Sequence, residues 1–209
     1  MIKILITDDH AIVRRGLRQI LSETSDIVVG DEAENAHQLL ELLPKNDYGV
    51  LVLDISLPGR SGFDILKQVK TLRPKLPILI HSMHSEEQFA VRALKAGASG
   101  YITKESAPEE LIKAIRKVHA GGRYVSATLG EKLALGLVED SSKAPHETLS
   151  DREYQVMYLI ASGKMSKDIA QELSLSVKTV STYRARVLEK MKMKTNADLT
   201  RYAIHNNLV

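Results

Sequence analysis

Acidic side chains, a hydroxyl group and a lysine recur at one kind of place in the first half of the sequence, directly after a short apolar run. Asp8 and Asp9 follow the first run, Asp54 ends another, and Ser82 and Lys104 follow two more. Three carboxylates that meet repel one another unless a cation lies between them, and such oxygen ligands suit Mg²⁺. A lysine and a hydroxyl can hold phosphoryl oxygens, and an ionised aspartate can accept that group. These residues therefore predict phosphoryl transfer onto Asp54.

The elements that must bring these residues together are short β-rich runs separated by amphipathic helical stretches. We predict strands over Ile2–Thr7, Ile27–Asp31, Val50–Asp54, Ile78–His81 and Tyr101–Thr103. Such alternation is typical of a parallel sheet covered by helices on both faces, whose ligands bind at the carboxyl ends of the strands. Residues 1–122 are therefore predicted to form a doubly wound α/β domain with a five-stranded parallel sheet.

The helical stretches carry their own signals. An apolar face predicts that the first of them docks on the sheet, and its members are Ile12, Val13, Leu17, Ile20 and Leu21. Two capping-box patterns, Ser85 with Gln88 and Ser106 with Glu109, predict the starts of two later helices.

Composition and charge exclude several classes of protein. The chain is 44% hydrophobic and 26% charged, which is ordinary for globular proteins and excludes a mostly disordered chain or a fibre. No apolar stretch approaches the roughly 18 residues of a membrane span, and the first residues lack the apolar region of a secretory signal. We therefore expect a cytoplasmic protein without a membrane partner. The absence of cysteine excludes disulfides, a thiolate nucleophile and cysteine-ligated zinc.

The pattern changes to all-α in the second half of the chain. Residues 123–147 are predicted to be a linker that holds a short helix over Thr128–Val138 and a polar segment from residue 139 onward. Residues 148–209 follow as a second domain, in which Ser150 and Glu153 form a capping box that begins a helix. Three further helices are predicted over Lys167–Leu173, Val177–Met191 and Asn196–Asn206.

A helix, a tight turn and a second helix with Ser176 as its N-cap predict a helix-turn-helix. Its predicted shared core comprises Ile169, Ala170, Leu173, Leu175, Val177, Val180, Val187, Leu188 and Met191. Residues 176–201 carry seven basic against two acidic side chains, a balance of +5 that suits a polyanion. The predicted DNA-contacting residues, suited to the major groove, are Lys178, Thr179, Ser181, Thr182, Arg184, Arg186 and Lys190. Charge alone leaves a solvated helix face or a small protein-binding bundle open.

Four segments of the first half, ITDDH, LVLDISLPGRSGFDIL, HSMHS and YITKESAPEEL, resemble the receiver domain of bacterial two-component response regulators. The resemblance covers about residues 1–122 and implies the flavodoxin-like form of the doubly wound fold. It implies that Asp54 is the phosphoacceptor and that the protein is not an enzyme, although a receiver can remove its own phosphoryl group.

The same resemblance assigns roles to the neighbours of Asp54. Asp9 and Asp54 would ligate Mg²⁺, Asp8 would help through water, and Ser56 would add its backbone carbonyl. Ser82 and Lys104 would bind the phosphoryl oxygens, and Tyr101 would be the switch residue whose ring turns inward when Ser82 moves. Pro58 and Gly62 would shape the adjacent loop, because proline fixes φ and glycine tolerates unusual dihedral angles.

The segment LSDREYQVMYLIASGKMSKDIAQELSLSVKTVSTYRARVLEKM resembles the LuxR/NarL-type helix-turn-helix, and the resemblance spans about residues 148–209. The resemblance implies that Val177–Lys190 is the recognition helix and that Asn196–Asn206 supports dimer formation on DNA. Together the two halves resemble response regulators of the NarL/FixJ class, which control transcription. The implied partners are a sensor histidine kinase, double-stranded DNA with a twofold-symmetric operator, a second copy of the phosphorylated chain and, as a further candidate, RNA polymerase.

Two other functions remain as alternatives. The first is a receiver-bearing adaptor whose helices bind protein instead of DNA, against which the basic recognition helix argues. The second is an aspartyl-phosphate phosphatase of the haloacid dehalogenase type. It is disfavoured because Ile-Ser-Leu follows Asp54, without a second acid two residues on.

Overall fold

The computed structural model describes residues 1–58, 61–136 and 144–209. These residues divide into two compact units, one formed by Met1–Gly136 and the other by residues 144–209. The predicted end of the linker helix at Val138 and the polar segment 139–143 lie outside the described residues. No helix in the described part of the chain combines the length and the apolar character needed to cross a membrane.

The first unit contains a sheet in which every neighbouring pair of strands is parallel, in the order β2-β1-β3-β4-β5. The strands are β1 (Ile2–Thr7), β2 (Ile27–Ala33), β3 (Val50–Leu53), β4 (Ile78–Ser82) and β5 (Gly100–Thr103). The helices are α1 (Ala11–Ser22), α2 (Ala36–Leu42), α3 (Gly62–Leu72), α4 (Glu86–Lys95), α5 (Pro108–His119) and α6 (Ala127–Gly136). The predicted α/β fold is confirmed.

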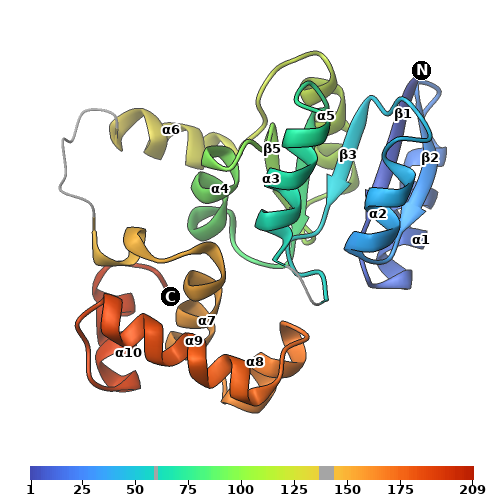
Figure 1. Cartoon of the computed structure of the whole chain (residues 1–209). Coiled ribbons are helices and arrows are strands. Elements are labelled where there is room, and N and C mark those ends of the chain that lie inside the picture. The colour runs from blue at the N-terminus through green and yellow to red at the C-terminus, as the bar shows by residue number, and fades with distance from the viewer. Residues whose placement is uncertain (59–60, 137–143) are drawn as a thin grey trace. The chain divides into compact units, whose positions relative to one another are not determined.

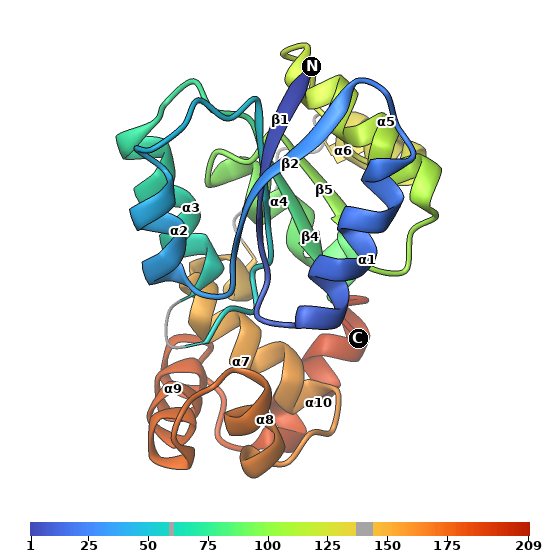
Figure 2. The same cartoon turned by 90° about the vertical axis from the view of Figure 1, so that its right-hand side faces the viewer.

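Helices cover both faces of this sheet, with α1 and α5 on one face and α2 and α3 on the other (Figure 2). Under α1 and α5, apolar side chains from all five strands form a buried cluster that includes Ile4, Ile27, Val52, Leu79 and Ile102. Leu17 and Leu21 attach α1 to this cluster. The predicted apolar face of α1 is wrong at Ile12, which is 80% exposed, whereas the next residue, Val13, packs against the cluster, so the buried side of the helix is narrower than predicted.

The two capping boxes predicted in this unit are wrong. Ser85 is the N-cap of α4, but its side chain accepts no capping hydrogen bond. Helix α5 has Ala107 as its N-cap, and Ser106 Oγ instead lies 2.9 Å from Thr103 Oγ1. The sequence pattern fails here because a nearby hydroxyl competes with the helix amides for Ser106.

In the described residues of the second unit, every regular secondary-structure element is a helix (Figure 1). Its elements are the short 3₁₀ turn η1 (Pro145–Thr148) and the helices α7 (Asp151–Ala161), α8 (Ser166–Glu172), α9 (Val177–Lys190) and α10 (Asn196–His205). The capping box of Ser150 and Glu153 is present, and the Ser176 side chain accepts a hydrogen bond from the Thr179 amide. Both caps occur where the sequence predicts them.

Helices α8 and α9 form a helix-turn-helix around a shared core. Ile169, Leu173, Val180 and Val187 are each 0% exposed. The predicted core is wrong at Val177, which is 48% exposed because the first residue of α9 projects beyond the packed helices. Ser174, in the turn, has φ of 50°, so a non-glycine residue adopts the left-handed region there.

Candidate functional site

The predicted acidic residues converge at the carboxyl edge of the sheet. Asp8 follows β1, and Asp54 follows β3 with its amide donating to the Thr7 carbonyl at 2.9 Å. The ammonium group of Lys104, which follows β5, lies 2.7 Å from Asp54 Oδ2 and 2.6 Å from Asp8 Oδ2. Asp8 and Asp54 are 1% and 2% exposed, so this edge holds two buried carboxylates around one cation.

The charges of these groups depend on one another. Burial is the largest influence on Asp54 and raises its pKa, and the Asp8 charge raises it further, while Lys104 opposes both. Burial by itself would lower the pKa of Lys104, but the charges and hydrogen bonds of Asp54 and Asp8 outweigh burial and raise that pKa. Lys104 therefore stays protonated and is the main group that favours the ionised, nucleophilic form of Asp54.

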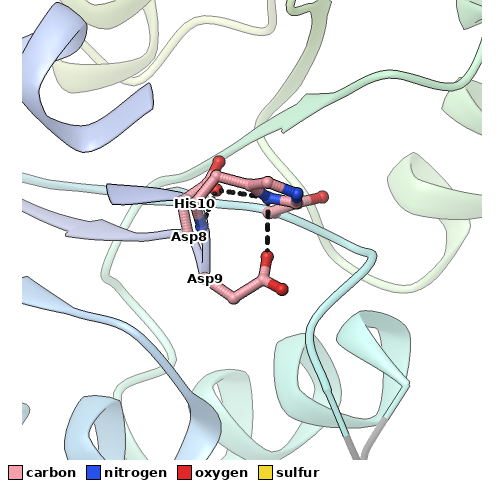
Figure 3. Close-up of side chains that lie close together, drawn as sticks. Asp8, Asp9 and His10 are labelled. Atoms are coloured by element: carbon pink, nitrogen blue, oxygen red, sulfur yellow. Dashed lines mark hydrogen bonds and ion pairs between the residues drawn. The ribbon is translucent and has the colours of Figure 1, made fainter. Parts of the chain in front are cut away.

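His10 joins this cluster, although sequence reasoning did not select it. Its Nδ1 lies 2.9 Å from Asp9 Oδ1 and 3.3 Å from Asp8 Oδ1, with the ring reaching both carboxylates (Figure 3). One ligand atom each from Asp8, Asp9, His10 and Asp54 fall within 4.8 Å of one another. The sequence signal that could have identified His10 is its position directly after Asp8 and Asp9.

The charge balance and the ligand atoms fit a divalent cation. With Asp8, Asp9 and Asp54 ionised, three negative charges face the single positive charge of Lys104, which leaves two negative charges uncompensated. Carboxylate oxygens are the ligands that hard cations such as Mg²⁺ prefer. The residues present therefore suit a divalent metal ion.

Ser56, Ser82 and Tyr101 lie around the same edge and are connected through His84. The Ser56 amide donates to Asp54 Oδ1 at 2.9 Å, and Ser56 Oγ lies 3.3 Å from His84 Nε2. Ser82 Oγ accepts from the His84 amide at 3.1 Å, and the buried Tyr101 hydroxyl donates to the His84 carbonyl at 2.9 Å. The Tyr101 ring is turned inward and is 0% exposed.

Gly62, near this edge, is required for a different reason from the one predicted. Its φ does not lie in the left-handed region. A Cβ at Gly62 would lie 2.3 Å from Ile55 Cα, so the close approach of two backbone segments is what excludes a side chain.

The candidate DNA-contacting side chains lie along α9 and differ in how firmly the domain holds them. Lys178, Ser181, Thr182 and Arg186 are exposed, while Thr179 and Arg184 are half-buried. Each of two hydroxyls donates to the carbonyl one turn earlier, Ser181 to Val177 and Thr182 to Lys178, both at 3.0 Å. Arg184 Nε donates to Asn196 Oδ1 at 2.5 Å, which directs this guanidinium toward α10.

Lys190, at the last turn of α9, has a partner inside the domain. Its Nζ donates to Glu153 Oε2 at 2.7 Å, and the Glu153 side chain is 5% exposed. Burial by itself would raise the pKa of Glu153, but the hydrogen bonds from Lys190 and Ser150 outweigh burial and lower it. The ion pair attaches α9 to the start of α7. Lys190 therefore stabilises the domain, a role that the basic stretch of the sequence does not predict.

Two protein-family models match the chain. The model of the response regulator receiver domain matches residues 4–116, and that of bacterial regulatory proteins of the luxR family matches residues 147–203. The response regulator UvrY of Escherichia coli (strain K12) is 34% identical over 209 residues, which are 100% of this chain and 96% of UvrY. The response regulator GacA of Pseudomonas aeruginosa is 33% identical over 210 residues, covering 100% of this chain and 98% of GacA.

Solved structures of RcsB are also similar to this chain. RcsB from Salmonella enterica serovar Typhimurium, bound to promoter rprA with the phosphomimetic BeF3-, has a TM-score of 0.66 and 30% identity, covering 97% of this chain and 98% of the other. A structure of two RcsB dimers bound to two parallel DNAs has a TM-score of 0.60 and 28% identity, covering 96% of each chain.

Proposed function

Because the chain belongs to the bacterial two-component response regulators that carry a LuxR-type DNA-binding domain, we propose that Asp54 is the residue whose phosphorylation controls its binding to DNA. As a member of this family the protein regulates transcription. In the proposal, residues 1–122 are the receiver, 123–147 the linker and 148–209 the DNA-binding domain. The observation that carries it is the position of Lys104 Nζ, within 2.7 Å of both Asp54 and Asp8 at the carboxyl edge of the sheet.

In the proposed reaction, a carboxylate oxygen of Asp54 attacks the phosphorus of a phosphohistidine on a sensor histidine kinase. The oxygen–phosphorus bond forms as the phosphorus–nitrogen bond breaks, and the histidine leaves with the electron pair of that bond. Lys104 holds Asp54 ionised beforehand and then donates to a phosphoryl oxygen. Ser82 Oγ accepts a hydrogen bond from the His84 amide in the unphosphorylated protein. In the proposed reaction the Ser82 hydroxyl donates a hydrogen bond to another phosphoryl oxygen.

The proposed cofactor is Mg²⁺, held by Asp9 and Asp54 with the Ser56 carbonyl, and assisted by Asp8 through water. When bound, it supplies positive charge close to the incoming phosphoryl oxygens. His10 lies against Asp8 and Asp9 and orients both carboxylates. Hydrolysis of the aspartyl phosphate by the receiver itself completes the proposed cycle.

In the DNA-binding half, α9 is proposed to enter the major groove, with its exposed Lys178 and Arg186 near the duplex. A dimer would pair two such helices with half-sites roughly 34 Å apart on a twofold-symmetric operator. The similarity to RcsB, whose dimers are described as bound to DNA, supports this arrangement. RNA polymerase is a further candidate partner of the bound dimer.

The assignment of Asp54 is tested by phosphotransfer from a phosphorylated sensor histidine kinase to the full chain. We expect Asp54→Asn to abolish acid-labile phosphate incorporation, because the amide keeps the shape of the side chain but loses the nucleophile. Asp64→Asn, the same change at an exposed position in the first turn of α3, is the matched control and should be phosphorylated normally. Normal incorporation into Asp54→Asn would exclude Asp54 as the acceptor.

A further inference from the structure

The exposed residues of α9 form one broad stripe along the helix. Val180 and Val187 are buried against the rest of the domain, whereas the exposed residues recur three or four positions apart, which places them on the opposite side. In the middle of the stripe lie Ser181, Thr182 and Ala185, which we call the central face. The other exposed members are Val177, Lys178, Arg186, Glu189 and Lys190.

The hydroxyl groups of the central face already donate to the helix itself. Ser181 donates to the Val177 carbonyl and Thr182 to the Lys178 carbonyl, both at 3.0 Å. Each hydroxyl oxygen can still accept a hydrogen bond. A hydroxyl that turned to donate to a base would lose its bond to the helix and gain little, whereas a hydroxyl that accepts from a base keeps both bonds. The central face therefore offers hydrogen-bond acceptors rather than donors.

Apolar atoms complete the central face. Because the Thr182 hydroxyl is directed to its own helix, the methyl group is the part of this side chain that packs against a ligand. Ala185 is exposed and presents its Cβ on the same side, three residues further along. Val177, which is 48% exposed, adds apolar surface at the start of the stripe. The helix thus combines acceptor oxygens with methyl groups.

The four bases present different groups in the major groove. Adenine offers the amino group at N6 and thymine offers its C5 methyl group, so an A·T pair combines a hydrogen-bond donor with an apolar group. Guanine presents the acceptors N7 and O6, which need donors from the protein. Cytosine presents an amino donor at N4 but carries no methyl group. The A·T pair therefore matches both properties of the central face.

We propose that α9 reads A·T base pairs at the centre of each half-site, with thymine methyl groups packed against Thr182 and Ala185 and an adenine amino group donating to a hydroxyl oxygen of the central face. This assignment rests on the proposed function, because it requires α9 to lie in the major groove. The charged donors Lys178 and Arg186 lie toward either end of the central face, where they face the phosphates that flank these base pairs.

The test begins with the duplexes that the phosphorylated full chain selects from a random DNA pool, in which A·T pairs should be enriched at the centre of each half-site. Each thymine of a selected duplex is then replaced, one at a time, by uracil, which pairs in the same way but lacks the C5 methyl group. Replacement at the central positions should weaken binding about fourfold, as the loss of one buried methyl group predicts. Replacement outside the half-sites should leave the affinity unchanged.

Two variants assign the methyl contact to α9. Thr182→Ser removes the methyl group but keeps the hydroxyl and its bond to the helix, so it should bind the thymine and uracil forms equally at the position that Thr182 contacts. Thr71→Ser is the matched control, because Thr71 is an exposed residue of α3 whose hydroxyl also donates to the carbonyl four residues earlier, at 2.9 Å. It should keep the preference of the parent chain for thymine.

Three outcomes would overturn the assignment of A·T pairs to the central face. They are G·C pairs at the centre of the selected half-sites, equal affinity of the parent chain for the thymine and uracil forms, and an unchanged preference for thymine in Thr182→Ser. If Lys178→Ala weakens binding to the selected duplex in any of these cases, α9 still lies on DNA and the proposed function stands. A pool in which the phosphorylated chain enriches no sequence would contradict the proposed function as well.

Discussion

Lys104 Nζ lies 2.7 Å from Asp54 Oδ2, although the two residues are 50 positions apart in the sequence. The pair joins the loops after β3 and β5, and the lysine side chain is only 6% exposed. An incoming phosphoryl group must therefore share this cation with the carboxylate that it joins. The receiver is prepared for phosphorylation because the Lys104 ammonium group is already in place before any phosphoryl group arrives.

Replacing Asp54 should change stability as well as phosphorylation. Burial raises the pKa of Asp54 above its ordinary value, so its stabilising contribution is present below the unfolded-state pKa and is lost as pH rises through the folded-state pKa. In metal-free buffer at pH 7, Asp54→Asn should therefore melt higher than the parent chain, by roughly 2–4 °C for each kcal/mol gained. Thermal melts from pH 3 to 7 measure the difference, which should shrink on acidification. A lower melting temperature at pH 7 would contradict this account of Asp54.

Removal of divalent cations should prevent phosphorylation of the parent chain. Asp8, Asp9 and Asp54 carry more negative charge than Lys104 balances, and the phosphoryl group adds more. Phosphotransfer to the receiver should stop in excess EDTA and recover when Mg²⁺ is added beyond the chelator, with kinase that was phosphorylated and freed of metal beforehand. Transfer that is indifferent to chelation would count against a metal site at these carboxylates.

Lys178 and Lys190 should behave differently although both lie on α9. Lys178→Ala should leave thermal stability unchanged but lower the log–log salt slope of DNA binding by about 0.9, the effect of one lost phosphate contact. Lys190→Ala should destabilise the DNA-binding domain by about 1 kcal/mol, because it breaks the pair with Glu153, and by no more, because Lys190 is 44% exposed and its charge is screened. Urea melts and salt titrations of both variants measure the two effects. A loss of stability in Lys178→Ala together with an unchanged stability of Lys190→Ala would refute the distinction.

Phosphorylation should tighten binding to a twofold-symmetric operator by favouring one arrangement of the two domains. The phosphoryl group can do so only by binding that arrangement better, through Ser82 and Lys104, which draw the loops that follow them, together with Tyr101, toward it. DNA titrations at one fixed salt concentration should rank the phosphorylated chain above the unphosphorylated chain and above Lys104→Ala. Arg184→Ala should weaken DNA binding without reducing phosphorylation. Equal affinities of the first three proteins would show that the receiver does not act on DNA binding through this site.

Much of the fold follows from local patterns in the sequence. The apolar runs predict the positions of all the strands that the structure describes, and β1, β3, β4 and β5 are apolar because they are buried almost along their whole length. The edge strand β2 is only partly buried, and it runs on beyond the predicted end at Asp31 to Ala33. Ser150 and Ser176 predict the starts of α7 and α9, because a capping hydrogen bond spans only three residues. The parallel order of the strands then brings Asp8, Asp54 and Lys104 to one edge.

What the tertiary structure alone decided concerns contacts between residues far apart in the sequence. The position of Lys104 between two carboxylates and the pairing of Lys190 with Glu153 each depend on how whole elements pack. The exposure of Ile12 and Val177 has the same origin, since hydrophobic periodicity gives the apolar side of a helix but not how much of it the neighbouring elements cover. Local sequence determines which elements form, whereas distances between their side chains are set by the register and packing of the whole domain.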